Sequence, residues 1–122
     1  VTKDPDGPEF GLFLRFLREN WNVWTKVTCP ERLSVSGPQA LHGEQHAYTD
    51  GVPFARRVVE EFPDRVLWGT DWPHPNLKDH MPDDGLLVDF IPHIAPTAQL
   101  QRKLLVDNPM RLYWPEEAGQ TP

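Results

Sequence analysis

Asp71 is the residue whose type and position in this sequence best suit catalysis. It follows the apolar run Arg65–Gly69 and opens a proline-rich loop that continues through His74 and Asn76. A carboxylate just beyond a buried strand can be shielded by the protein and still face substrate and water, which suits a general base. The same position would also suit a carboxylate that caps a turn or closes an ion pair, so both interpretations stay open.

A second loop places a cation after another strand-like segment. Arg32 lies four residues beyond Thr28, and its guanidinium offers a fork of donors that matches a carboxylate. A solvated surface arginine is the alternative. In the loop that begins at Asp71, Trp72 and two prolines restrict the backbone and leave Asp71 and Asn76 few orientations. This restriction favours a preorganised site or a purely structural turn.

The remaining reactive side chains give weaker signals. His42 and His46 have the spacing of two ligands on one helical face, but they lie in a loop without helical periodicity, so no metal is predicted. Cys29 follows a strand, and a small buried thiol is favoured over a nucleophile. Lys26 shares one face of its strand with Thr28, so it is either an inward charge that needs a partner or an outer surface lysine.

Elements that alternate between helix and strand must position these residues. The apolar spacing predicts a helix at 8–20, a strand at 23–28, a loop at 29–47, a helix at 52–62 and a strand at 65–69. Asp50 is the expected N-cap of the second helix. Helices are also predicted at 84–91, capped by Asp84, and at 97–106, capped by Thr97 and stopped by Asp107-Asn108-Pro109. The order indicates an α/β fold of parallel βα units. Two strands cannot form a parallel sheet with covered edges, so we expect the chain to be a piece of something larger.

Composition narrows the class of protein. The 122 residues carry a formal net charge of -6, which argues against a nucleic-acid partner. No apolar run approaches the ~20 residues that span a membrane. The single Cys29 excludes an internal disulfide and fits a reducing compartment, so a cytoplasmic protein is expected.

Several segments together resemble one family of enzymes. The stretch 65–76, with the core Gly-Thr-Asp-Trp-Pro-His, is similar to strand eight of the amidohydrolase superfamily, whose barrels end that strand with a catalytic aspartate. The segments 29–32, 81–85, 91–97 and 105–114 resemble the 2-pyrone-4,6-dicarboxylate hydrolase family. The resemblance covers about Pro5 to Trp114.

The resemblance implies a fold and an activity. It implies a (β/α)8 TIM barrel in which residues 1–114 supply about helix 6, strand 7, helix 7, strand 8 and C-terminal helices, with 115–122 as a polar tail. That family hydrolyses the lactone ester of 2-pyrone-4,6-dicarboxylate to 4-oxalomesaconate, reversibly and without a metal or other cofactor, in protocatechuate and lignin degradation. By position, Asp71 would activate the water, Arg32 would contact the dicarboxylate substrate and Asn76 would bind one of its carboxylates.

The resemblance also implies missing parts. The family's paired histidines after strand one, its histidine after strand six, and further substrate-binding residues have no counterpart here. We therefore expect these 122 residues to need an N-terminal barrel portion and to lack lactonase activity alone. A metal-dependent decarboxylase or hydratase of the same superfamily and a non-catalytic truncated chain are the alternatives.

Overall fold

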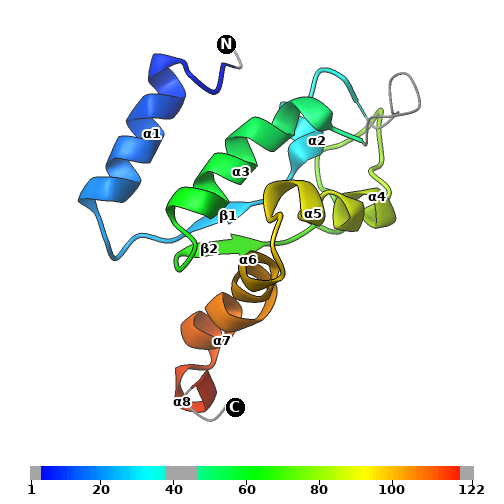
Figure 1. Cartoon of the computed structure of the whole chain (residues 1–122). Helices are drawn as coiled ribbons and strands as arrows, with labels where there is room; N and C mark the ends of the chain where they lie inside the picture. Colours follow the sequence, from blue (N-terminus) through cyan, green and yellow to red (C-terminus); the bar gives the residue numbers. More distant parts are fainter. Residues whose placement is uncertain (1–3, 38–46, 119–122) are drawn as a thin grey trace.

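A computed structural model describes residues 4–37 and 47–118 of the chain. Its two strands, β1 (Thr25–Val27) and β2 (Val66–Trp68), form a parallel pair in which Thr25 lies opposite Val66 and Val27 opposite Trp68. Helix α3 (Val52–Glu61) connects them and lies over the sheet, and α1 (Pro8–Glu19) lies to one side of it (Figure 1). The predicted parallel βα arrangement is confirmed for this part of the chain. Both strands are shorter than the apolar patterns indicated.

The remaining elements are short helices. Helix α2 (Pro30–Leu33) follows β1, and the 3-10 turn η2 (Thr49–Gly51) precedes α3. After β2 come α4 (Asp84–Asp89), α5 (Ile91–Ile94), α6 (Ala98–Arg102), the π-helical turn η3 (Lys103–Asp107), α7 (Asn108–Tyr113) and α8 (Pro115–Ala118). Thus α2 lies within the segment predicted as a loop at 29–47, and α8 lies within the predicted polar tail. None of the described helices has the length and apolar content needed to cross a membrane.

The hydrophobic core lies between the sheet and its helices. Leu14 and Leu17 of α1, Val59 of α3, Val66 of β2 and Leu104 of η3 are each no more than 1% exposed. They belong to one cluster that also takes in residues of α4 and α5. The apolar spacing that predicted α3 therefore identified a face that packs inward. Of the α1 residues at that spacing, Leu17 is buried, but Leu12, Phe13 and Phe16 are 38% to 66% exposed.

Arg65 connects the end of α1 to the start of β2. Arg65, just before β2, donates to the carbonyl oxygens of Leu17, Asn20 and Val23, at distances of 2.8 to 3.0 Å. The last carbonyls of a helix have no intrahelical partner, so the guanidinium satisfies groups at the end of α1. This fixes the chain between α1 and β1 against the start of β2.

Two of the predicted caps are wrong. The N-cap of α3 is Gly51, without a side-chain hydrogen bond, and Asp50 instead accepts bonds from residues 34–36. The cap of α4 is Asp83, whose side chain accepts from the Gly85 N–H, while Asp84 is the first helical residue. Thr97 is confirmed as the cap of α6, since its side chain accepts from the Leu100 N–H.

The predicted helix stop at Asp107-Asn108-Pro109 is also wrong. The chain stays helical from Ala98 to Tyr113 because η3 widens to a π-helical turn just before Pro109, which then sits in the first turn of α7. A proline is tolerated there because its missing N–H is not needed. Asn108 is only 1% exposed and donates through Nδ2 to the carbonyl oxygens of Pro63 and Val66. The asparagine read as a helix stop therefore anchors α7 to β2.

Candidate active site

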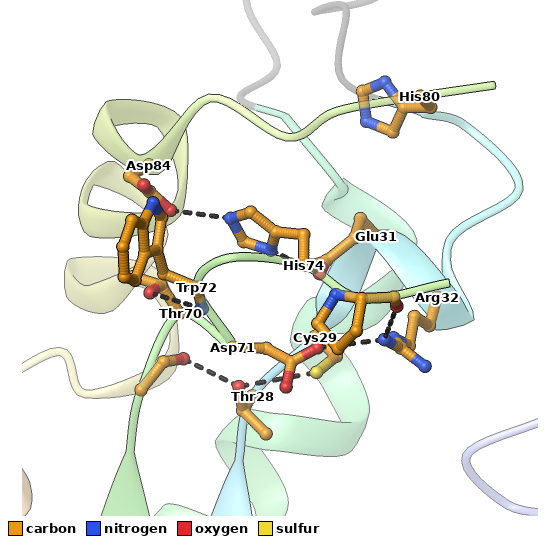
Figure 2. A network of polar contacts seen from close by, with 12 residues as sticks. Thr28, Cys29, Glu31, Arg32, Thr70, Asp71, Trp72, His74, His80 and Asp84 are labelled. Carbon is orange, nitrogen blue, oxygen red and sulfur yellow. Dashed lines mark hydrogen bonds and ion pairs between the residues drawn. The ribbon is translucent and has the colours of Figure 1, made fainter. Parts of the chain in front are cut away.

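The two loops that follow β1 and β2 meet at one edge of the sheet. The carboxyl ends of parallel strands point the same way, so Cys29 and Asp71 emerge side by side (Figure 2). Beyond the last ladder pair, the Thr28 hydroxyl donates to the Gly69 carbonyl oxygen over 2.8 Å. That bond ties the two strand ends together directly beneath Asp71.

Arg32 and Asp71, predicted separately from the sequence, form an ion pair. Arg32 Nη2 lies 3.0 Å from Asp71 Oδ2 and also donates to the Pro75 carbonyl oxygen over 2.7 Å. The Arg32 side chain is 41% exposed and that of Asp71 32% exposed. The Arg32 guanidinium binds Oδ2 of Asp71, and the Cys29 thiol lies within reach of the same carboxylate.

The backbone around Asp71 is strained. Cys29, Asp71, His74 and Asn76 all have φ between 58° and 70°, in the left-handed region. Asn, Asp and His tolerate this region better than most residues, yet each such residue costs on the order of 1 kcal/mol. Four such residues in the two strand-end loops indicate that the surrounding contacts hold these loops in shape, which is common where side chains must be aimed.

Asn76 is less well defined as a site residue. It is exposed, and its side chain makes no hydrogen bond to another residue of ranges 4–37 and 47–118. It follows Pro75, whose carbonyl binds Arg32. Asn76 therefore lies next to the ion pair without joining it, and its predicted role in binding a carboxylate stays a prediction.

A hollow of about 250 Å³ opens beside Asp71 on the sheet. Lys26, Thr28 and Asp71 line it together with Tyr113 of α7. Lys26 and Thr28 thus share one face, as the strand pattern predicted, and Lys26 brings a cation to the same hollow as the candidate base. This local positive charge is compatible with an anionic ligand even though the chain is acidic overall.

The thiol of Cys29 is poorly suited to nucleophilic attack. Burial raises its pKa most. The hydrogen bond with the Thr28 hydroxyl lowers that pKa, and the carboxylates of Asp71 and Glu31 raise it. A reactive cysteine needs the opposite environment, since the thiolate is the nucleophile. The preference for a structural thiol therefore has physical support.

One group of donors has the spacing of a metal site. Among the described residues, ligand atoms of Cys29, Glu31 and Asp71 lie within 4.8 Å of one another. They fit a divalent metal poorly, because the Arg32 guanidinium binds Asp71 and the raised pKa of Cys29 favours the neutral thiol over the ligating thiolate. His42 and His46, considered above as ligands, lie outside the described residues.

Three residues that had no predicted site role lie together beside Asp71 (Figure 2): His74, Asp84 and Glu31. His74 is 2% exposed; its Nε2 lies 2.9 Å from Asp84 Oδ1, and its Nδ1 lies 3.7 Å from Glu31 Oε1 (Figure 2). The sequence assigned His74 only to the shape of the loop, treated Asp84 as a cap and passed over Glu31. The one available signal for Glu31 was its place beside Arg32 in a strand-end loop.

A separate hydrogen bond joins Tyr48 to His80 in the loop after β2. The Tyr48 hydroxyl and His80 Nε2 lie 2.8 Å apart. Tyr48 is 1% exposed, and burial raises the pKa of its hydroxyl, with Glu31 contributing to the same shift. His80 thus holds the loop after β2 against the chain that precedes α3.

Known proteins match this chain over nearly its whole length. A family model described as amidohydrolase matches residues 2–114. A 2-pyrone-4,6-dicarboxylate hydrolase of Comamonas testosteroni is 84% identical over 117 residues, covering 96% of this chain and 38% of the relative. A 4-sulfomuconolactone hydrolase of Hydrogenophaga intermedia is 40% identical, covering 92% of this chain and 35% of the relative.

A solved structure agrees with the sequence comparisons. The apo crystal structure of an Agrobacterium tumefaciens protein superposes with a TM-score of 0.66 at 27% identity, covering 90% of this chain and 36% of that one. The chain thus spans little more than a third of the length of these relatives. The matched family model covers well over half of the chain, and the chain belongs to the amidohydrolase family.

Proposed function

We propose that this chain carries the last two βα units of a (β/α)8 barrel that hydrolyses the lactone ester of 2-pyrone-4,6-dicarboxylate. The observation that carries the proposal is the Arg32–Asp71 pair at the ends of two adjacent parallel strands. In such barrels the active site lies at this edge of the strands. The 84% identity to a hydrolase of that name supports the choice of substrate.

Asp71 acts as the general base in this proposal. A carboxylate oxygen of Asp71 accepts a proton from water, and the resulting hydroxide attacks the lactone carbonyl carbon. The bond between that carbon and the ring oxygen then breaks, and Asp71 returns the proton to the departing oxygen. The product is the enol form of 4-oxalomesaconate, and the same steps in reverse close the ring.

Arg32 and Asn76 bind the carboxylates of the substrate. The guanidinium suits a carboxylate through paired N–H donors, and Nη2 of Arg32 already donates to the Pro75 carbonyl oxygen, next to Asn76. Lys26 lies in the same hollow as Asp71 and adds positive charge for a dianion. A lactone is an activated ester, so a positioned base and donors to its carbonyl oxygen can suffice without a metal. The other donors of the proposed site belong to further barrel units.

The test replaces Asp71 in a complete barrel. This segment is grafted into the Comamonas testosteroni relative in place of its matching residues, which the 84% identity makes a conservative exchange. Asp71→Asn keeps the size of the side chain but removes the base, and we expect kcat to fall by about 10²–10⁴. The matched control is Asp79→Asn, an exposed carboxylate in the same loop, which leaves kcat within twofold, about 0.4 kcal/mol. Turnover by Asp71→Asn within about tenfold of the parent graft, 1.4 kcal/mol, would rule out the base.

A parent graft without turnover would contradict the choice of substrate. Turnover that disappears with a chelator and returns with a divalent metal would support a metal-dependent activity instead. In that case the contribution of Cys29, Glu31 and Asp71 would have to come from a rearranged site, since Arg32 binds Asp71 here.

A further inference from the structure

His74 lies in a buried cluster of charges whose contacts are incomplete. Its side chain is 1% exposed, and the Glu31 side chain beside it is fully buried. Within the described part of the chain, both carboxylate oxygens of Glu31 and Nδ1 of His74 have no hydrogen-bond partner. A buried carboxylate is costly unless an opposite charge compensates it. The imidazole at 3.7 Å is the group placed to do so.

The geometry fixes the form of the ring that satisfies both neighbours. Nε2 lies 2.9 Å from Asp84 Oδ1, while Nδ1 faces Glu31. A neutral imidazole donates from one nitrogen only, so its other lone pair would face a carboxylate. The imidazolium presents an N–H to each side. Cys29, Tyr48 and Asp71 are the other titratable groups near Glu31, and the raised pKa values of Cys29 and Tyr48 keep those two neutral.

The cluster joins three segments around Asp71. Glu31 belongs to α2, His74 to the loop after β2, and Asp84 to the start of α4. Neighbouring residues of α2 therefore reach the same loop twice, Glu31 at His74 and Arg32 at Asp71. The two contacts act together because the backbone N–H of His74 donates to the backbone carbonyl oxygen of Asp71 over 2.7 Å. A shift of His74 moves the turn that aims the Asp71 carboxylate.

We propose that His74 is a positioning residue, held as an imidazolium between Glu31 and Asp84, and that this cluster fixes the orientation of Asp71. His74 touches no reacting atom in this scheme; it acts through the turn it shares with Asp71. The catalytic consequence rests on the function proposed above, while the charge state and the coupling of the loop do not. The two parts are therefore tested separately.

The first experiment uses the chain itself. Long-range proton–nitrogen NMR spectra of the ¹⁵N-histidine-labelled chain at pH 7.5 report whether each ring nitrogen is protonated, and His74→Asn identifies the His74 signals by their loss. We expect both His74 nitrogens to be protonated in the parent chain. Glu31→Gln, which keeps size but removes charge, converts the ring to a neutral tautomer, whereas Asp79→Asn leaves it unchanged. A neutral ring in the parent chain at pH 7.5 would overturn the proposal.

The second experiment uses the graft. His74→Gln places an amide near Nε2, and we expect kcat to fall by about 100-fold, the loss typical of a displacement of ~1 Å, with KM within about threefold. In His74→Asn the amide replaces Nδ1. We expect a similar fall in kcat, because each variant keeps only one of the two contacts, with Asp84 or with Glu31.

The double variant separates positioning from a general loss of structure. Adding His74→Gln to Asp71→Asn should lower kcat by less than about threefold more, because His74 acts through Asp71 and removing both is non-additive. Full additivity of the two losses, or an effect confined to KM, would overturn the positioning role. A parent graft that does not turn over the pyrone would contradict the proposed function alone, since the NMR result still decides the cluster.

Discussion

Replacing Asn108 by Ala should destabilise the chain although Asn108 contacts no candidate site residue. Its Nδ2 donates to the Pro63 oxygen over 2.7 Å and to the Val66 oxygen over 2.8 Å, and the residue is 1% exposed. Each such bond contributes about 0.5–1.5 kcal/mol net, so losing both costs about 1–3 kcal/mol. The better helix propensity of Ala returns at most about 0.5 kcal/mol. We therefore expect a loss of about 2 kcal/mol in the free energy of unfolding.

Urea unfolding followed by tryptophan fluorescence measures this loss, since the chain has five tryptophans. The midpoint should fall while the slope with urea stays constant, which indicates a change in stability rather than in the surface exposed. Asn22→Ala, in an exposed turn before β1, is the matched control and should change stability by less than about 0.5 kcal/mol.

Asn108→Asp sharpens the test. It keeps the shape of the side chain but turns a carboxylate toward two carbonyl oxygens, so it should destabilise at neutral pH at least as much as Asn108→Ala. A loss below about 1 kcal/mol for Ala, or an Asp variant as stable as the parent, would refute the view that these two bonds anchor α7 to β2.

Three further predictions concern the loops and the chain as a whole. Burial raises the pKa of Asp50, but hydrogen bonds from Ser34, Val35 and Ser36 outweigh burial and hold that pKa at about 2. Because the pKa is lower in the folded state, the ionised carboxylate stabilises the fold above about pH 4, and this stabilisation disappears as the pH falls toward 2. Asp50→Asn should therefore cost about 1 kcal/mol at pH 7, after allowance for solvent screening, and nothing near pH 2, whereas Asp89→Asn shows no such pH dependence in urea unfolding. At pH 8, iodoacetamide should react with Cys29 more slowly than it reacts with free glutathione, because the pKa of Cys29 is raised. The reaction should be faster in Asp71→Asn, since Asp71 contributes to that raised pKa. Rapid labelling of Cys29 in the parent chain would contradict this. The 122-residue chain alone should show no hydrolysis of 2-pyrone-4,6-dicarboxylate by absorbance, and detectable turnover would refute the need for further barrel units.

The sequence predicted those features that depend on local pattern. Helix α1, the apolar face of α3 and the cap at Thr97 follow from spacing and from short-range hydrogen bonds. Asp71 and Arg32 were placed in strand-end loops by their distance from apolar runs, and the parallel pairing of β1 and β2 then brought them together. No pattern indicated that the two would bind each other, because their separation along the chain is long.

Features that depend on distant partners could not be predicted. Asp and Asn are both common at helix ends, and propensity alone assigns Asp50 and Asn108 there. In the structure their polar groups bind backbone of other segments, at residues 34–36 and at Pro63 and Val66. His74 and Glu31 were missed for the same reason, since nothing near them in the sequence shows that they share a buried site.

The open strand edges and exposed apolar side chains of the described residues are compatible with the proposed barrel. Each strand has a hydrogen-bonded neighbour on one side only within the described part of the chain. Large apolar side chains are also exposed, among them Leu12 and Trp21, which precede β1 in the chain, and Tyr113 and Trp114 at the end of α7, with exposed fractions of 52% to 82%. A barrel removes open strand edges and covers such faces with the neighbouring units. The Arg32–Asp71 pair would then lie at the barrel mouth, where added units would bury it further and strengthen the electrostatic interaction that aims the base.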